Sequence, residues 1–102
     1  QKSLEDYNKV IELSPRLAGV YFERGQIKNQ LERTDEALVD FNTSIGLFPF
    51  NPFAYLHRGN TFRKLGMNEN ALKDYLTYLK LNPNAPDAEE IKREIEDMQY
   101  KR

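Results

Sequence analysis

The chain contains an internal repeat, because a shift of 34 positions brings much of the sequence onto itself. At this offset, the repeat period, ten of 34 positions are identical without gaps: Tyr21/Tyr55, Arg24/Arg58, Gly25/Gly59, Leu31/Leu65, Ala37/Ala71, Leu38/Leu72, Asp40/Asp74, Thr43/Thr77, Leu47/Leu81 and Pro49/Pro83. A fixed period of this length indicates a repeat architecture, in which each unit buries its apolar face against its neighbours.

Half of a further unit precedes the two full ones. Seven residues align with positions one period later: Leu4, Asp6, Tyr7, Asn8, Ile11, Leu13 and Pro15. The apolar residues recur at helical spacing, and no alternating strand pattern competes with it. We therefore expect helices near residues 2–13, 17–31, 35–47, 52–65, 69–81 and 86–100.

Over residues 1–85 the repeated residues resemble the tetratricopeptide repeat (TPR), whose signature places aromatic residues, glycine, alanine and proline at fixed offsets. The second unit reads Tyr55, Arg58, Gly59, Phe62, Ala71, Tyr75 and Pro83, and the first reads Tyr21, Arg24, Gly25, Lys28, Ala37, Phe41 and Pro49. The half unit supplies Ser3, Tyr7 and Pro15. The sequence departs from the family pattern at Arg24 and Arg58, where leucine is usual, and at Lys28, which replaces an aromatic residue.

The resemblance implies an all-α fold of antiparallel helix-turn-helix repeats, stacked as a right-handed superhelix (a TPR solenoid). We expect the second helix of a truncated repeat in residues 1–15, repeats in 16–50 and 51–85, and a capping helix in 86–102. A cap needs an apolar stripe on one side and a polar outer face. The last segment has such a stripe, in Ala88, Ile91, Ile95 and Met98.

Several residues have a direct structural interpretation. The glycines of each repeat would let two helix backbones approach closely, since glycine inside a helix otherwise costs up to about 1 kcal/mol, and Ala37 and Ala71 would serve the same contact. Asn51 before Pro52 is a favourable helix start. Gly66 is a natural helix stop. Thr34 and Asn68 are predicted to cap the helices that follow them.

The N-terminal helix is expected to be only partly covered. Gln1 opens inside a helical pattern without an initiating methionine, so we interpret the chain as part of a longer protein. Upstream repeats would then cover the apolar residues of helix 2–13, which are Leu4, Tyr7, Val10 and Ile11. In isolation these residues are predicted to drive self-association, giving a homo-oligomer through this helix.

Composition excludes several classes of function. The 15 basic and 16 acidic residues nearly cancel, so nothing favours nucleic-acid binding. The absence of cysteine excludes disulfides and thiolate chemistry. Apolar runs are too short to insert into a membrane. We expect a soluble protein, with the cytoplasm favoured although the compartment is not determined by the sequence.

No catalytic, cofactor or metal site is expected. The single histidine, His57, has no serine or carboxylate at a telling spacing. Contact with a partner or with water is a better explanation for His57 than a role as a general base. No metal-ligand pattern, phosphate-binding glycine loop or nucleophile elbow is present. The segment is therefore not predicted to be an enzyme.

The repeated arginines suggest a polar pairing. Arg24 and Arg58 share the repeat period with Asp6, Asp40 and Asp74. We expect each arginine to lay its stem on the seam between helices and to pair with an aspartate. The alternative is two solvated side chains that repeat by descent. An exposed pair would contribute about 0–1 kcal/mol.

A partner surface follows from the resemblance, because the first helix of each TPR unit lines the concave groove of the superhelix. The predicted groove residues are Phe22, Gln26, Asn29, Phe53, Leu56, His57, Asn60, Arg63 and Lys64, with Gly19, Glu23 and Gln30 beside them. Exposed apolar residues rimmed by polar groups are typical of interaction sites. The alternative for Phe22, Phe53 and Leu56 is ordinary core packing.

One specialisation of the family can be tested by alignment. Chaperone-adaptor members hold a carboxylate-ended peptide with a clamp of cationic and amide side chains. The corresponding positions here are Phe22, Gln26, His57, Asp87 and Ile91, none of which supplies the required cation. The segment is therefore not expected to be such a clamp.

Three functions remain open at this point. The leading hypothesis is a protein-interaction scaffold that binds a partner peptide or helix in the groove. The second is a structural or self-associating array, which the partly covered first helix favours. The third is a regulatory region attached to a catalytic domain outside this segment.

Overall fold

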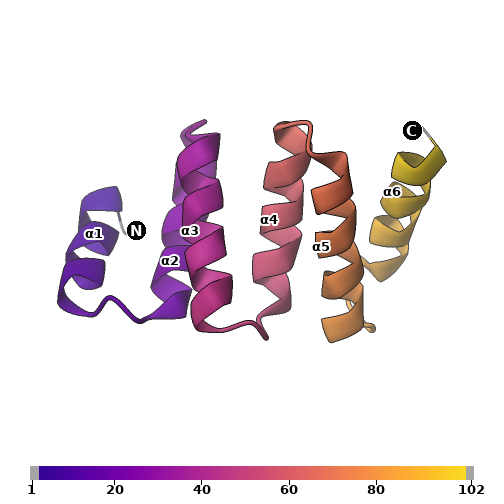
Figure 1. Cartoon of the computed structure of the whole chain (residues 1–102). Coiled ribbons are helices and arrows are strands. Elements are labelled where there is room, and N and C mark those ends of the chain that lie inside the picture. Colours follow the sequence, from indigo (N-terminus) through magenta and orange to yellow (C-terminus); the bar gives the residue numbers. More distant parts are fainter. Residues whose placement is uncertain (1–2, 101–102) are drawn as a thin grey trace.

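The computed structural model describes residues 3–100, and in that range it consists of six helices with no strand. They are α1 (Leu4–Leu13), α2 (Ala18–Gln30), α3 (Thr34–Leu47), α4 (Pro52–Lys64), α5 (Asn68–Leu81) and α6 (Ala88–Tyr100). Figure 1 shows them as an elongated array with α1 at one end and α6 at the other. All six predicted helices are present, and the ends that fall within residues 3–100 differ by at most two residues from the prediction.

The start of α4 follows the sequence prediction. The side chain of Asn51 accepts a hydrogen bond from the backbone N–H of Phe53 at 3.1 Å, and Pro52 is the first helical residue. Proline fits there because its missing N–H would have no partner in the first turn. At α1, Ser3 and Asp6 exchange side-chain to backbone bonds in a capping box.

The predicted caps Thr34 and Asn68 are wrong by one position. Both are first helical residues, and the caps are Arg33 and Met67, which make no side-chain capping bond. The preceding turn decides this. The N–H of Met67 bonds to the carbonyl of Phe62, five residues back, while Gly66 adopts a φ of +76°. This Schellman closure uses backbone alone, and α5 starts directly after it.

The glycines of the repeat mark the closest helix crossings. A Cβ on Gly25 would lie 2.8 Å from Cε1 of Phe41, and one on Gly59 would lie 2.9 Å from Cε1 of Tyr75. The groups nearest to the two glycines are therefore the rings of Phe41 and Tyr75, and the close contact predicted for Ala37 and Ala71 stays a prediction. Both alanines are fully buried in α3 and α5.

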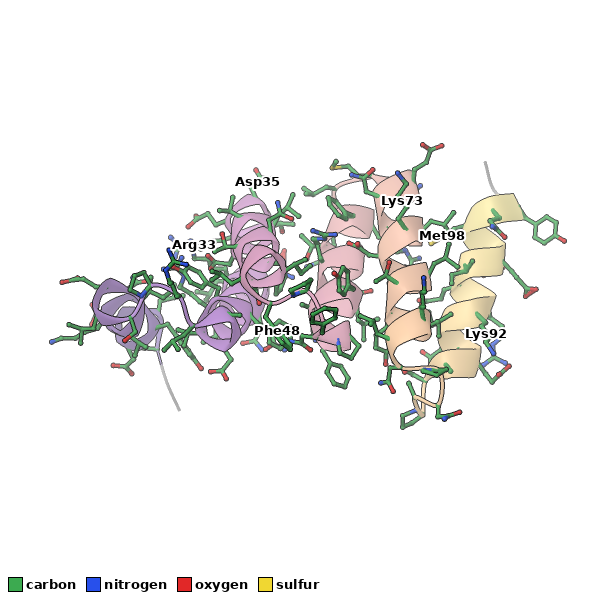
Figure 2. All side chains as sticks on the ribbon, turned by 60° about the horizontal axis from the view of Figure 1, so that its bottom comes forward. Arg33, Asp35, Phe48, Lys73, Lys92 and Met98 are labelled. Carbon is green, nitrogen blue, oxygen red and sulfur yellow. The ribbon has the colours of Figure 1, made fainter. Side chains whose placement is uncertain are left out.

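The helix α6 closes the C-terminal end of the core. Its Ala88, Ile91 and Ile95 are buried in one cluster with Tyr75 and Tyr78 of α5. Met98 packs against this cluster, and Figure 2 shows it between α5 and α6. The predicted apolar stripe therefore packs as expected.

The helix α1 is covered unevenly. Tyr7 is buried, contrary to the expectation of partial cover, whereas Leu4, Val10 and Ile11 are half-buried as predicted. Leu13 is 75% exposed. Because α1 packs against α2 alone among the described helices, its other side keeps apolar surface in contact with water.

Candidate partner-binding face

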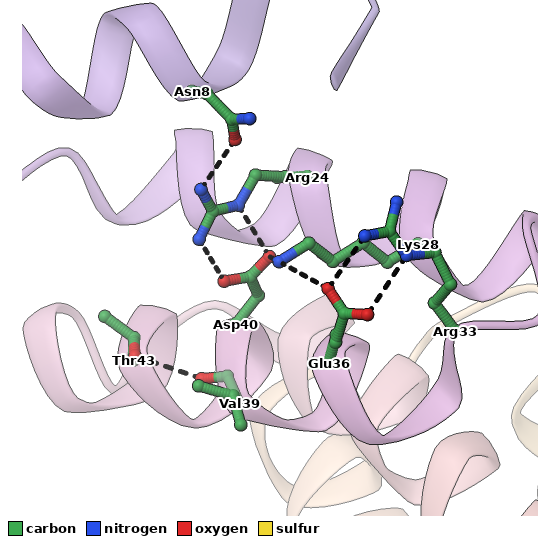
Figure 3. A network of polar contacts seen from close by, with 8 residues as sticks. All are labelled: Asn8, Arg24, Lys28, Arg33, Glu36, Val39, Asp40 and Thr43. Carbon is green, nitrogen blue, oxygen red and sulfur yellow. Dashed lines mark hydrogen bonds and ion pairs between the residues drawn. The ribbon is translucent and has the colours of Figure 1, made fainter. Parts of the chain in front are cut away.

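The predicted arginine–aspartate pairs form, and they tie three helices together. Nε and Nη2 of Arg24 donate to the two carboxylate oxygens of Asp40 at 2.8 and 2.7 Å, and Nη1 donates to Oδ1 of Asn8 at 2.9 Å (Figure 3). The same arrangement recurs one period later in Arg58, Asp74 and Asn42. Each arginine thereby links its own repeat to the last helix of the repeat before it.

These pairs are more buried than the sequence suggested. Asp40 is 1% exposed and Asp74 is 3% exposed, so the value given above for an exposed pair does not apply. The hydrogen bonds from each guanidinium to its aspartate raise the pKa of Arg24 and of Arg58. The sequence analysis did not predict Asn8 and Asn42 as partners of the arginines. Their separation by one repeat period could have indicated this role.

Lys28 extends this network in the first repeat. Its Nζ lies 3.2 Å from Asp40 and 3.8 Å from Glu36, which also pairs with Arg33 (Figure 3). The second repeat has Phe62 at the equivalent position, and the Arg58 guanidinium lies 5.5 Å from its ring centre. The departure at Lys28 therefore exchanges a cation–π contact for a second ion pair to the same aspartate.

The predicted groove residues of α2 pack against α4. The ring of Phe22 lies 5.3 Å from that of His57 and 6.0 Å from that of Phe41, centre to centre. Nε2 of Gln26 is 3.3 Å from Nε2 of His57. Burial lowers the pKa of His57. This histidine therefore packs between two repeats and is half-buried, and its predicted contact with a partner stays a prediction.

Polar contacts continue along α2 and α4. Asn29 donates from Nδ2 to Oγ1 of Thr61 at 2.9 Å. Asn60 accepts a hydrogen bond from the hydroxyl of Tyr75. Arg63 lies 3.4 Å from Glu94 of α6, so side chains connect α4 to the last helix. Its hydrogen bond with Tyr75 raises the pKa of Arg63.

The nine predicted groove residues thus divide into two groups. Half-buried residues make contacts within or between repeats: Phe22, Gln26, Asn29, Leu56 and His57. Exposed residues all lie on α4: Phe53, Asn60, Arg63 and Lys64. Core packing therefore explains why Phe22 and Leu56 are half-buried, whereas Phe53 keeps 48% of its surface exposed.

Comparison with known proteins decides the family. Two models of the tetratricopeptide repeat match the sequence, one over residues 18–51 and the other over residues 52–85. Together they span more than half of the chain. The chain belongs to the tetratricopeptide repeat family.

Solved TPR structures resemble the whole chain. The first TPR domain of Spaghetti (RPAP3), bound to the HSP90 peptide SRMEEVD, is 27% identical with a TM-score of 0.87, over 95% of this chain and 77% of that one. The first TPR domain of human RPAP3 is 26% identical with a TM-score of 0.86, over 96% and 77%. The TPR domain of Arabidopsis OM64 is 23% identical with a TM-score of 0.85, over 92% and 78%. A search of curated proteins found no match.

These findings support a protein-interaction TPR repeat scaffold with an all-α superhelical fold. Within residues 3–100, no three histidine, aspartate or glutamate residues are grouped so that they could hold a metal ion. None of the described helices is long and apolar enough to cross a membrane. The domain boundaries and the groove residues remain predictions.

An exposed aromatic pair of this TPR chain was not among the residues predicted from the sequence. Phe48 and Phe50, at the turn between α3 and α4, are 50% and 66% exposed, with ring centres 5.7 Å apart. Figure 2 labels Phe48. Phe48 also lines a hollow at the start of α2, together with Leu17, Val20 and Leu47. The repeat could have revealed this pair, because the equivalent positions of the neighbouring units hold polar residues. One period earlier these are Ser14 and Arg16, and one period later they are Asn82 and Asn84.

Proposed function

We propose that this chain binds a segment of a partner protein, an extended peptide or a helix, across the face formed by α2, α4 and α6. The observation that carries the proposal is Phe53. Its ring is 48% exposed and lies 6.2 Å from the ring of Tyr78, on the helix that also carries the exposed polar residues Asn60, Arg63 and Lys64. Accessible aromatic side chains are enriched among the anchor residues of binding hot spots.

The fold does not require phenylalanine at this position. The residue one period earlier is Gly19, and the residue one period later is Asp87. Gly19 is the second residue of α2, and Asp87 lies directly before α6, so the repeat register places all three residues at the start of a helix. A large apolar side chain in one copy of three is therefore better explained by a ligand than by packing. The Spaghetti (RPAP3) domain, which was solved with a bound peptide, supports a peptide ligand.

The test uses two single variants that each remove one exposed phenylalanine. Phe53→Ser removes the proposed anchor, and Phe50→Ser removes a more exposed ring from the turn between α3 and α4. Phe22 and Leu56 are left unchanged because both pack against other residues. Their substitution could reduce capture by disturbing the fold rather than by removing a binding contact.

Each immobilised variant captures proteins from a lysate, which are identified by mass spectrometry. We expect at least one partner to be lost by about tenfold in Phe53→Ser and retained by Phe50→Ser. Unchanged capture by Phe53→Ser, with its helicity intact, would contradict the proposal.

A structural or self-associating array is the second candidate. It is favoured by Leu13, Phe48 and Phe50, which leave apolar surface exposed at the end of α1 and at the turn between α3 and α4. If both phenylalanine variants captured the same proteins and only Phe50→Ser reduced self-association, this candidate would be the better one.

A further inference from the structure

The last helix carries a stripe of carboxylates. Asp87 directly precedes α6, and Glu90, Glu94 and Asp97 follow at intervals of three, four and three residues. Side chains at this spacing lie along one side of a helix. Glu90 and Asp97 are exposed.

The stripe faces the same side as Phe53. The Arg63–Glu94 contact of 3.4 Å turns Glu94 toward α4, and the hydroxyl of Tyr78, whose ring lies beside Phe53, donates to Asp87. The register of the repeat agrees. It places the four acids at the positions equivalent to Phe53, Leu56, Asn60 and Arg63 of α4.

The other side of α6 is different. Glu89, Lys92, Arg93 and Glu96 line a hollow with Leu76 and Leu79 of α5, and Lys92 pairs with Glu89. Acids and bases are balanced there, two of each. On α4, Arg63 pairs with Glu94 of the stripe, and the next residue, Lys64, is exposed at the end of the helix. Negative charge is therefore in excess on the proposed binding face, and not on the reverse side of the same helix.

We infer that the partner segment is basic as well as apolar. Its apolar side chain contacts Phe53, and its lysine or arginine side chains lie along the carboxylates of α6. This inference rests on the proposed function and adds the charge of the partner segment to it. Complementary charge selects partners and speeds their association, whereas like charge rejects them. A segment such as SRMEEVD, the peptide bound to the RPAP3 domain, carries three acids against one base and would meet like charge here.

The experiment selects peptides from a random dodecamer display library on the immobilised chain. Two double variants of α6 are compared with the wild type. Glu90→Gln with Asp97→Asn neutralises two exposed acids of the stripe, and Glu89→Gln with Glu96→Gln removes the same charge from the reverse side. Phe53→Ser is included to show whether any selected peptide uses the proposed face.

We expect peptides that depend on Phe53 and carry a net positive charge. Their affinity should fall by about three- to tenfold in the stripe variant, remain unchanged in the reverse-side variant, and weaken with added salt. Peptides that depend on Phe53 but are neutral or acidic would overturn the basic partner and leave the proposed function standing. Selected peptides that ignore Phe53, or no selected peptide at all, would count against both.

Discussion

At the scale of the residue, the repeat signature acts through side-chain volume. Gly59 leaves room for the ring of Tyr75, which is fully buried. A methyl group on Gly59 would also lie 3.3 Å from Cβ of Asp74, and so would press on backbone-proximal atoms that cannot rotate away. Close-packed interiors transmit such strain. Gly46, in α3, has open space where its Cβ would be.

These two glycines give opposite predictions for the same change. Gly59→Ala should destabilise the chain by about 1–3 kcal/mol through overpacking. Gly46→Ala should stabilise it by about 0.5–1 kcal/mol, because alanine loses less conformational freedom in a helix. Urea denaturation followed by circular dichroism measures both. Equal effects of the two substitutions would show that the crossing at Gly59 is not tight.

At the scale of the element, the buried pair of Arg58 and Asp74 holds α4 against α5, and the bond to Asn42 adds α3. The side chain of Arg58 is 21% exposed, whereas the side chain of Asp74 is almost wholly buried. The cost of disrupting the pair therefore depends on which partner is removed. Removing the arginine alone leaves a buried charge without compensation.

Arg58→Leu restores the residue usual in the family and is nevertheless predicted to destabilise the chain by about 2–4 kcal/mol. Adding Asp74→Leu should recover most of this loss, because the unpaired carboxylate is then absent. Thermal and urea unfolding of the two variants measure the difference. If the Arg58→Leu variant were as stable as the wild type, the pair would contribute no stability to the fold.

The join between α5 and α6 is predicted to respond to alkaline pH. Burial, aided by the hydrogen bond to Asp87, raises the pKa of Tyr78 to about 12 from its usual 10.0. Since the unfolded chain ionises first, this stabilisation is full below pH 10 and is lost as pH rises toward 12. Burial also raises the pKa of Tyr7 and Tyr75, which act in the same direction.

Tyr78→Phe isolates the contribution of this hydroxyl. At about pH 8 the variant should be less stable by about 1 kcal/mol, because Asp87 loses its donor. Above pH 10 the gap should narrow, because the variant has no phenol to ionise at this position. Urea denaturation across this range gives the free energies, and phenolate absorbance follows the ionisation. A gap that stays constant with pH would contradict the buried, neutral hydroxyl.

At the scale of the whole molecule, exposed apolar residues gather where repeats join. Phe48 and Phe50 lie on the turn from the first repeat to the second, and their counterparts in the neighbouring turns are polar. The fold is therefore stable without aromatic residues at such turns. Their exposed surface favours association of the chain with itself or with another protein.

The double variant Phe48→Asn, Phe50→Asn copies the residues of the next turn, Asn82 and Asn84. It should keep the stability of the wild type within about 0.5 kcal/mol, as expected for surface changes. Any concentration-dependent rise in mass, measured by size-exclusion chromatography with light scattering, should be reduced. Self-association that persists undiminished would place the contact elsewhere, with the half-buried side of α1 as the first site to test.

The sequence alone determined the family and the six helices, and it predicted that Arg24 and Arg58 each pair with an aspartate, while the structure identified Asp40 and Asp74 as the partners. These features recur with the period of the repeat. Residues that recur in this way indicate the helices and contacts that each unit of the fold shares with the next. The local start at Asn51 and Pro52 was also predictable, since capping depends on neighbouring residues. The positions of Thr34 and Asn68 were not, because the backbone closure of the preceding helix fixes where the next one begins.

Only the tertiary structure decided which residues of the predicted face remain accessible. Phe22, Phe53 and Leu56 share one helical spacing, yet Phe22 packs on Phe41 and His57 while Phe53 stays half exposed. A helical pattern gives the direction of a side chain from its own axis, but not the residues that a neighbouring helix brings opposite it. For the same reason the burial of Asp74 and the orientation of Glu94 toward Arg63 depended on how the helices pack in three dimensions.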